Sequence, residues 1–83
     1  MKEFKQGEFI IATKNIISTD GYRITKNSKY QILYVDKRFD DYTIRDDTRQ
    51  EFVFDDDCFD SNSEYYCFMS LKEFRKQKIE SIL

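Results

Sequence analysis

Short runs of apolar and β-branched residues recur along this chain, and each run predicts one β-strand. Residues 8–13 follow Gly7 and are rich in Phe and Ile, a composition that favours a strand. Residues 29–36 place apolar side chains on both faces of an extended chain, which is typical of a strand buried on both sides in a small closed barrel. Residues 42–45 and 50–54 each follow an acidic turn, so we expect these last three strands to form an antiparallel meander.

The remaining segments carry weaker patterns. Residues 14–28 break up around the turn-forming cluster at 18–21, and we expect a long loop that folds back onto the barrel. Residues 55–64 are polar and acidic, which predicts a loop with room for a short helical turn or strand. Residues 65–68 are aromatic-rich and predict a last short strand.

A capping box marks the start of a C-terminal helix. Ser70 can accept a hydrogen bond from the amide of Glu73, whose side chain can reach back to the amide of residue 70. We therefore predict a helix from Leu71 to about Ile82. An imperfect apolar stripe along it would dock on the body of the domain or on another subunit. The residues of this stripe are Leu71, Phe74, Ile79, Ile82 and Leu83.

The composition fits one small folded domain. The chain has 83 residues, of which 40% are apolar and 17% aromatic, and it contains two glycines and no proline, so no stretch reads as a linker. We predict a single mostly-β (α+β) domain over residues 1–83, with a barrel body at 7–68 and a helix at 70–83. The sequence carries neither the apolar stretch of a signal peptide nor a membrane-spanning run, which predicts a cytoplasmic protein.

The order of the predicted elements resembles the SH3-like small β-barrel: a strand, a long loop, a three-strand meander, an acidic loop and a closing segment. Residues 24–33, 42–47 and 52–55 also look like a group of short uncharacterised proteins of phages and low-GC Gram-positive bacteria. In that group a K-x-Y-x-h-L strand leads to an I-x-D-D hairpin and then to an aromatic strand. The resemblance covers residues 7–59 and implies a fold; by analogy it also implies a host-directed role.

Residues that usually carry catalysis or hold a metal are scarce. Histidine is absent and the two glycines stand fourteen residues apart, so the chain has neither the usual general base nor a phosphate-binding loop. Cys58 and Cys67 lack further Cys or His partners and are expected to be free thiols. An EF-hand loop that begins at Asp60 would need Gly at Tyr65 and Glu at Leu71. We therefore predict a non-enzymatic protein without cofactor, open at most to adventitious binding of a divalent cation.

Charge is distributed unevenly along the chain. The net charge is +3 over residues 1–35, −7 over 36–64 and +2 over 65–83. The acidic part predicts a face that steers association with a basic partner, such as a DNA-binding or DNA-encircling replication protein. A DNA-mimicking phage inhibitor of a host replication or defence protein would fit, although aspartates also simply favour turns. The candidate partner-binding residues are Asp46, Asp47, Glu51, Asp55, Asp56, Asp57, Asp60 and Glu64.

The C-terminal part predicts two further surfaces. Residues 65–68 hold three aromatics that cannot all face one small interior, and with the helix they form a candidate homodimer interface. The interface residues would be Tyr65, Tyr66, Phe68, Leu71, Phe74, Ile79 and Ile82. Lys72, Arg75 and Lys76 fall close together on the helix and offer an alternative, a nucleic-acid-binding barrel, although a pI near 5.1 opposes it. A third alternative is an accessory structural domain.

Overall fold

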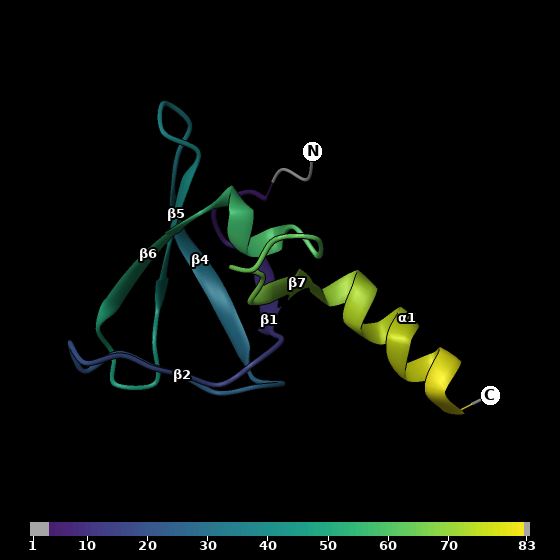
Figure 1. Ribbon diagram of the computed structural model, residues 1–83. Coiled ribbons are helices and arrows are strands. Elements are labelled where there is room, and N and C mark those ends of the chain that lie inside the picture. The colour runs from purple at the N-terminus through teal and green to yellow at the C-terminus, as the bar shows by residue number, and fades with distance from the viewer. Residues whose placement is uncertain (1–3, 83) are drawn as a thin grey trace.

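A curled antiparallel sheet with one C-terminal helix forms the computed structural model of this chain (Figure 1), which describes residues 4–82 and the side chains of residues 4–78. The strands within this range are β1 (Phe9–Ala12), β2 (Ile16–Ile17), β3 (Arg23–Ile24), β4 (Lys29–Asp36), β5 (Asp41–Arg45), β6 (Glu51–Asp55) and β7 (Phe68–Ser70). A short 3-10 helix, η1 (Asp56–Phe59), precedes β7, and α1 (Leu71–Ile82) follows it. The sheet order is β6-β5-β4-β1-β7, and β2 and β3 pair separately as a hairpin.

β1 lies between β4 and β7, so segments from the two halves of the chain meet on this strand. Ile10 pairs with Tyr30 of β4 on one side and with Ser70 of β7 on the other. Beyond β4, β5 and β6 complete the sheet, with Ile32 opposite Ile44. All these pairings are antiparallel, and the predicted three-strand meander is confirmed.

One face of the sheet carries the core, and aromatic rings fill much of it. The ring of Phe54 lies 4.6 Å from that of Phe68, and Phe59 of η1 stacks on Phe4 at 4.2 Å. Each such ring can remove about 150–250 Å² from water, so a few of them give a small domain an adequate core. Aliphatic and tyrosine side chains complete it: Ile10, Ala12, Ile24, Tyr30, Ile32, Tyr42 and Ile44.

The outer face of the meander is open, contrary to the prediction that residues 29–36 are buried on both sides. The register of β4 shifts between Ile32 and Tyr34, as in a β-bulge. Tyr34 therefore turns outward and is 58% exposed, whereas Val35 packs against the core. Val53 of β6 is likewise 59% exposed. The sheet thus curls around a single core as a half-barrel.

Residues 14–28, predicted to be a long loop, contain the β2–β3 hairpin. Ile24 of β3 is 1% exposed and enters the core, whereas Ile17 of β2 is 78% exposed. Gly21 in the connecting turn has a φ of 93°, which other residues adopt only with strain, and its amide donates to the Ser18 carbonyl at 3.1 Å. Each strand has two residues, which is too short for an alternating pattern to show in the sequence.

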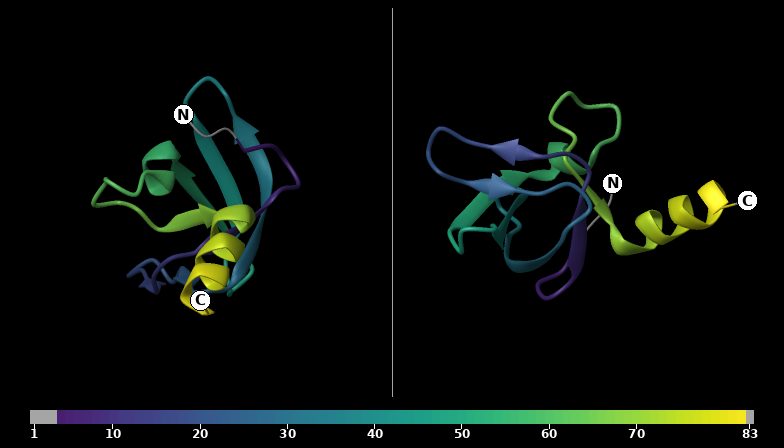
Figure 2. Two further views of the ribbon diagram at one scale, coloured as in Figure 1. Left: turned by 90° about the vertical axis from the view of Figure 1, so that its right-hand side faces the viewer. Right: turned by 90° about the horizontal axis from the view of Figure 1, so that it is seen from below.

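α1 begins at the predicted capping box and extends away from the sheet. The Glu73 amide donates to Ser70 Oγ at 3.1 Å. The helix contacts β1 and β7, where Ile11 and Met69, on the face opposite the core, are 3% and 8% exposed. Figure 2 shows the later turns of α1 leaving the body of the molecule. No helix in the described part of the chain is long and apolar enough to cross a membrane.

Candidate functional site

Asp46, a predicted partner-binding residue, is buried in the turn between β5 and β6, where it is 5% exposed. Its Oδ1 accepts hydrogen bonds from the amides of Thr48 at 3.0 Å and Gln50 at 2.8 Å, and its Oδ2 accepts one from the amide of Arg23 at 2.8 Å. Burial raises the pKa of the Asp46 carboxyl, but these hydrogen bonds outweigh burial and hold the pKa below its usual value. Asp46 therefore shapes the turn and does not belong to an exposed acidic face.

Asp47 fastens the same turn to the segment that joins β3 and β4. Its Oδ1 accepts a hydrogen bond from the Tyr30 hydroxyl at 2.7 Å, and its Oδ2 accepts one from Thr25 Oγ1 at 2.6 Å. The Tyr30 hydroxyl in turn accepts from the Thr25 amide at 2.8 Å. Burial raises the pKa of Tyr30, and the Asp47 carboxylate raises it further against the opposing Thr25 hydrogen bond. For Asp46 and Asp47, the structure favours the alternative that aspartates serve turns.

Glu51 lies at the same end of the sheet and faces a charge of opposite sign. In the β5–β6 ladder it pairs directly with Arg45, and opposite charges in such a pair attract each other. The negative electrostatic potential at this end of the sheet is therefore weaker than the number of carboxylates there indicates. Four residue steps along β6, about 13 Å, separate Glu51 from Asp55 at the other end.

The strongest cluster of carboxylates lies at that other end of β5 and β6. Side-chain oxygens of Asp55, Asp56 and Asp57 all lie within 4.8 Å of one another, and Asp41 pairs with Asp55 across the strands. Repulsion from Asp55, with partial desolvation and the charges of Asp56 and Asp60, raises the pKa of Asp57. We call Asp41, Asp55, Asp56, Asp57 and Asp60 the acidic end.

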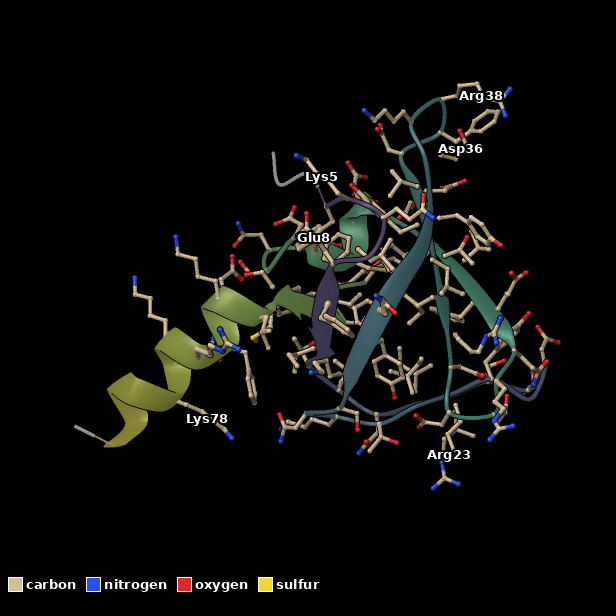
Figure 3. The ribbon with its side chains drawn as sticks, turned by 180° about the vertical axis from the view of Figure 1, so that it is seen from behind. Lys5, Glu8, Arg23, Asp36, Arg38 and Lys78 are labelled. Atoms are coloured by element: carbon tan, nitrogen blue, oxygen red, sulfur yellow. The ribbon has the colours of Figure 1, made fainter. Side chains whose placement is uncertain are left out.

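Charge beside the acidic end is partly compensated. Figure 3 shows Asp36 and Arg38 at the tip of the β4–β5 hairpin. Arg38 Nε lies 3.4 Å from Asp36 Oδ1, and hydrogen bonds from the Arg38 side chain and amide lower the pKa of Asp36. Glu64 is exposed in the loop between η1 and β7. The negative charge that has no ion pair among the described residues therefore centres on η1.

The acidic end can interact with cations of two kinds. Clustered carboxylate oxygens suit a hard metal ion, and they equally suit the lysine and arginine side chains of another protein. Asp55 has a structural role as well, because its Oδ1 accepts a hydrogen bond from the Asp57 amide at 3.2 Å and caps η1. Asp56 and Asp57 are therefore the better positions at which to change the charge.

The aromatic segment is only partly on the surface. Tyr65 is 61% exposed and Tyr66 is half-buried, with its pKa raised by that burial. Phe68 is 0% exposed and packs in the core, so it cannot contact another chain as predicted. The last strand also begins at Phe68, three residues later than the predicted strand at 65–68. Of the three aromatics, Tyr65 presents the most surface.

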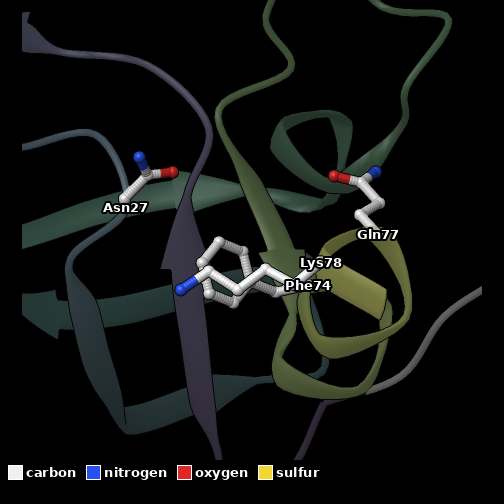
Figure 4. Close-up of a pocket in the computed structure, with 4 residues that line it drawn as sticks. All are labelled: Asn27, Phe74, Gln77 and Lys78. Carbon is white, nitrogen blue, oxygen red and sulfur yellow. The ribbon is translucent and has the colours of Figure 1, made fainter. Parts of the chain in front are cut away.

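The helical part of the predicted interface lies beside an open groove. Leu71 and Phe74 are half-buried, and the side chains of Ile79 and Ile82 lie outside the described residues. The groove, of about 380 Å³, separates α1 from the turn before β4 (Figure 4) and is lined by Asn27, Phe74, Gln77 and Lys78. Lys78 Nζ lies 5.0 Å from the centroid of the Phe74 ring. The exposed cations of the helix are Lys72, Arg75, Lys76 and Lys78.

Two features could not be read from the sequence. The outward-facing Tyr34 occupies a position that alternation with Tyr30 and Ile32 assigns to the interior. Cys58 and Cys67 are neighbours, since the Cys67 amide donates to the Cys58 carbonyl at 2.9 Å. Their spacing gave no sign of this contact, because it depends on how η1 folds back beside the start of β7.

No protein-family model matches the sequence, no curated protein matches it, and no solved structure matches the chain. A function must therefore be inferred from the surfaces described above. The acidic end is the most strongly charged of them, and the exposed Tyr65 and the cations of α1 are the others.

Proposed function

We propose that this chain is a small, non-enzymatic protein–protein binding module that docks its acidic end on a basic surface of a partner. The observation that carries the proposal is the crowding of the carboxylates of Asp55, Asp56 and Asp57 within 4.8 Å. Their repulsion raises the pKa of Asp57, so the isolated protein holds these charges at some expense of free energy. A basic surface would relieve the repulsion and would be attracted from a distance.

A DNA-binding protein is the class of partner that this surface suits. Duplex DNA carries one charge per roughly 1.7 Å of axis, and proteins that bind it present clustered lysine and arginine. Carboxylates on alternate residues of one strand lie about 6.6 Å apart, too far to imitate DNA, whereas side-chain oxygens of Asp55, Asp56 and Asp57 lie within 4.8 Å of one another. In its most specific form, the proposal is a phage-encoded inhibitor that occupies the DNA-binding site of a host replication or defence protein.

We also propose that the half-barrel is of the SH3-like type. β1 and β7, the first and last strands in chain order, are paired, a hairpin occupies the long connection after β1, and η1 lies in the connection between β6 and β7. This arrangement supports the resemblance in element order. It adds nothing about chemistry, because one fold can serve many functions.

A charge-matched pair of variants tests the proposed function. Asp56→Asn with Asp57→Asn removes two charges from the acidic end, and Asp20→Asn with Glu8→Gln removes two exposed charges elsewhere; each pair changes the net charge of −2 by the same amount. Affinity capture from a bacterial lysate should retain a basic DNA-binding protein on the wild type and on the Asp20/Glu8 variant. The Asp56/Asp57 variant should retain about tenfold less, as quantified by mass spectrometry, and duplex DNA should compete with the wild type. Equal retention by both variants would contradict the proposal.

Direct nucleic-acid binding is the second candidate, because α1 carries four exposed cations on a helix that extends from the body. A gel-shift measurement with duplex DNA at low salt separates the two functions. The acidic-end proposal expects no shift. A shift that is lost when Lys72, Arg75 and Lys76 are changed to Gln, and that weakens steeply with salt, would favour the basic helix instead.

A further inference from the structure

The two cysteines, nine residues apart in the sequence, are in contact in the fold. Cys58 belongs to η1, and Cys67 directly precedes β7. The Cys67 amide donates to the Cys58 carbonyl at 2.9 Å, and the two thiols are close enough for each to shift the pKa of the other. The backbone hydrogen bond brings the two backbones to the close spacing that a disulfide requires.

The two thiols differ in access and acidity. Cys58 is half-buried and can be reached from solvent, whereas Cys67 is 2% exposed. A side-chain hydrogen bond with Cys67 lowers the pKa of Cys58, and this lowering outweighs the burial and the neighbouring Asp55 and Asp57 charges. The same hydrogen bond, together with burial, raises the pKa of Cys67. Cys58 is thus the better nucleophile, and Cys67 is held where it can attack the Cys58 sulfur once Cys58 has formed a mixed disulfide.

We propose that Cys58 and Cys67 form a reversible intramolecular disulfide, so that this pair is an oxidation site for small disulfides of the glutathione type. The proposal uses two thiols that the proposed function does not use, although Cys58 lies in η1 beside carboxylates of the acidic end. It rests on the juxtaposition of a thiol in η1 with one directly before β7, joined by a backbone hydrogen bond.

The reaction is a two-step thiol–disulfide exchange. The Cys58 thiolate attacks one sulfur of glutathione disulfide, forms a mixed disulfide and releases one glutathione thiolate. Cys67 then loses its proton to solvent and attacks the Cys58 sulfur, which forms the internal disulfide and releases the second glutathione. The protein loses two hydrogen atoms, and glutathione disulfide is reduced to two molecules of glutathione.

Oxidation would fasten η1 to the start of β7 and close the loop over residues 59–66. This loop carries Asp60 of the acidic end and the exposed Tyr65. The bond would restrict the loop in the folded and unfolded states alike. Amide hydrogen exchange in residues 60–66 should therefore be slower in the oxidised protein than in the reduced protein.

Intact-mass measurement tests the proposal on the wild-type protein. Reduced protein is incubated with glutathione disulfide in native buffer, quenched with acid and digested. We expect a product about 2 Da lighter than the reduced protein and a peptide pair linked through Cys58 and Cys67. In guanidinium chloride, closure of the internal bond should be at least about tenfold slower, because the fold no longer holds the sulfurs together.

Single variants assign the order of attack. Cys67→Ser should retain a stable glutathione adduct on Cys58, since the resolving thiol is missing. Cys58→Ser should react about tenfold more slowly, because Cys67 is buried. Persistent glutathione adducts on the native wild type, disulfide-linked dimers, two unreacted thiols, or equal closure rates in native and denaturing buffer would each overturn the proposal.

Discussion

Asp46 and Asp57 stand at opposite ends of the β5–β6 hairpin, and their pKa values move in opposite directions. Asp46 is enclosed, and three backbone amides point at its carboxylate. Asp57 is exposed and faces three other aspartates. The number of donors around each carboxylate, rather than its residue type, decides whether it stabilises the fold or strains it.

Asp46→Asn should destabilise the protein by about 2 kcal/mol at neutral pH, because hydrogen bonds to a charged acceptor are lost and an amide N–H is turned toward other donors. The pKa of Asp46 is lowered in the folded state, so its stabilisation is present above the unfolded-state pKa, near 3.9. It is lost as the pH falls through the folded-state value. Urea denaturation should therefore show a gap between wild type and variant that shrinks as the pH falls below the unfolded-state pKa of about 3.9. Asp20→Asn, at an exposed site, is the control and should change stability by less than about 0.5 kcal/mol; equal midpoints for wild type and Asp46→Asn at neutral pH would contradict the account.

At the scale of elements, the long strands and the helix could be predicted because each repeats a pattern over several residues. β2 and β3 could not, since two residues leave no period to detect. The misassignment of Tyr34 has a different cause: the bulge after Ile32 reverses the alternation, so Val35 faces the core instead. A bulge depends on the partner strand, which a single segment of sequence does not reveal.

The candidate site, like the fold, could be predicted from the sequence only in part. Asp55, Asp56 and Asp57 are consecutive, so their crowding follows from the sequence alone. The roles of Asp46 and Asp47 depend on residues more than twenty positions away, and local composition carries no information on such contacts. The Cys58–Cys67 contact is hidden because it depends on how η1 folds back beside the start of β7.

The hydrogen bond between Ser70 Oγ and the Glu73 amide, 3.1 Å long, sets the point where the sheet gives way to α1. Ser70→Ala removes this acceptor and should lower stability by about 1 kcal/mol. Hydrogen exchange at the amides of residues 71–74 should accelerate more than exchange in β4 and β5. Ser70→Asp keeps an acceptor at the cap and should stay close to the wild type, so a loss of stability as large as that of Ser70→Ala would argue against capping.

At the scale of the whole molecule, α1 extends from the sheet and contributes to principal extents of 39 × 27 × 24 Å. Part of the helix therefore lies away from the core that its own chain provides. The half-buried Leu71 and Phe74 lie in the first turns of α1, and Tyr65 is exposed in the loop before β7. A second copy of the chain would supply apolar surface for them, which is the basis of the proposed homodimer.

Sedimentation equilibrium tests the homodimer. The wild type should show a mass above that of the 10.1 kDa chain, rising with protein concentration. Tyr65→Ser should weaken association about tenfold, because aromatic residues contribute strongly at the centre of interfaces. Tyr34→Ser, an equally exposed tyrosine on the outer face of β4, should leave it unchanged. A monomer at every concentration for the wild type would remove the homodimer.

The position of β1 between β4 and β7 also has a consequence for the chain as it is being made. β1, β4, β5 and β6 can pair once residues up to 55 have left the ribosome, but the second edge of β1 stays open until residues 68–70 follow. An open edge presents unpaired N–H and C=O groups to any other extended chain. Premature termination in residues 56–67 would therefore release a nearly complete sheet in which one edge of β1 is unpaired. Such fragments should aggregate unless they are degraded rapidly.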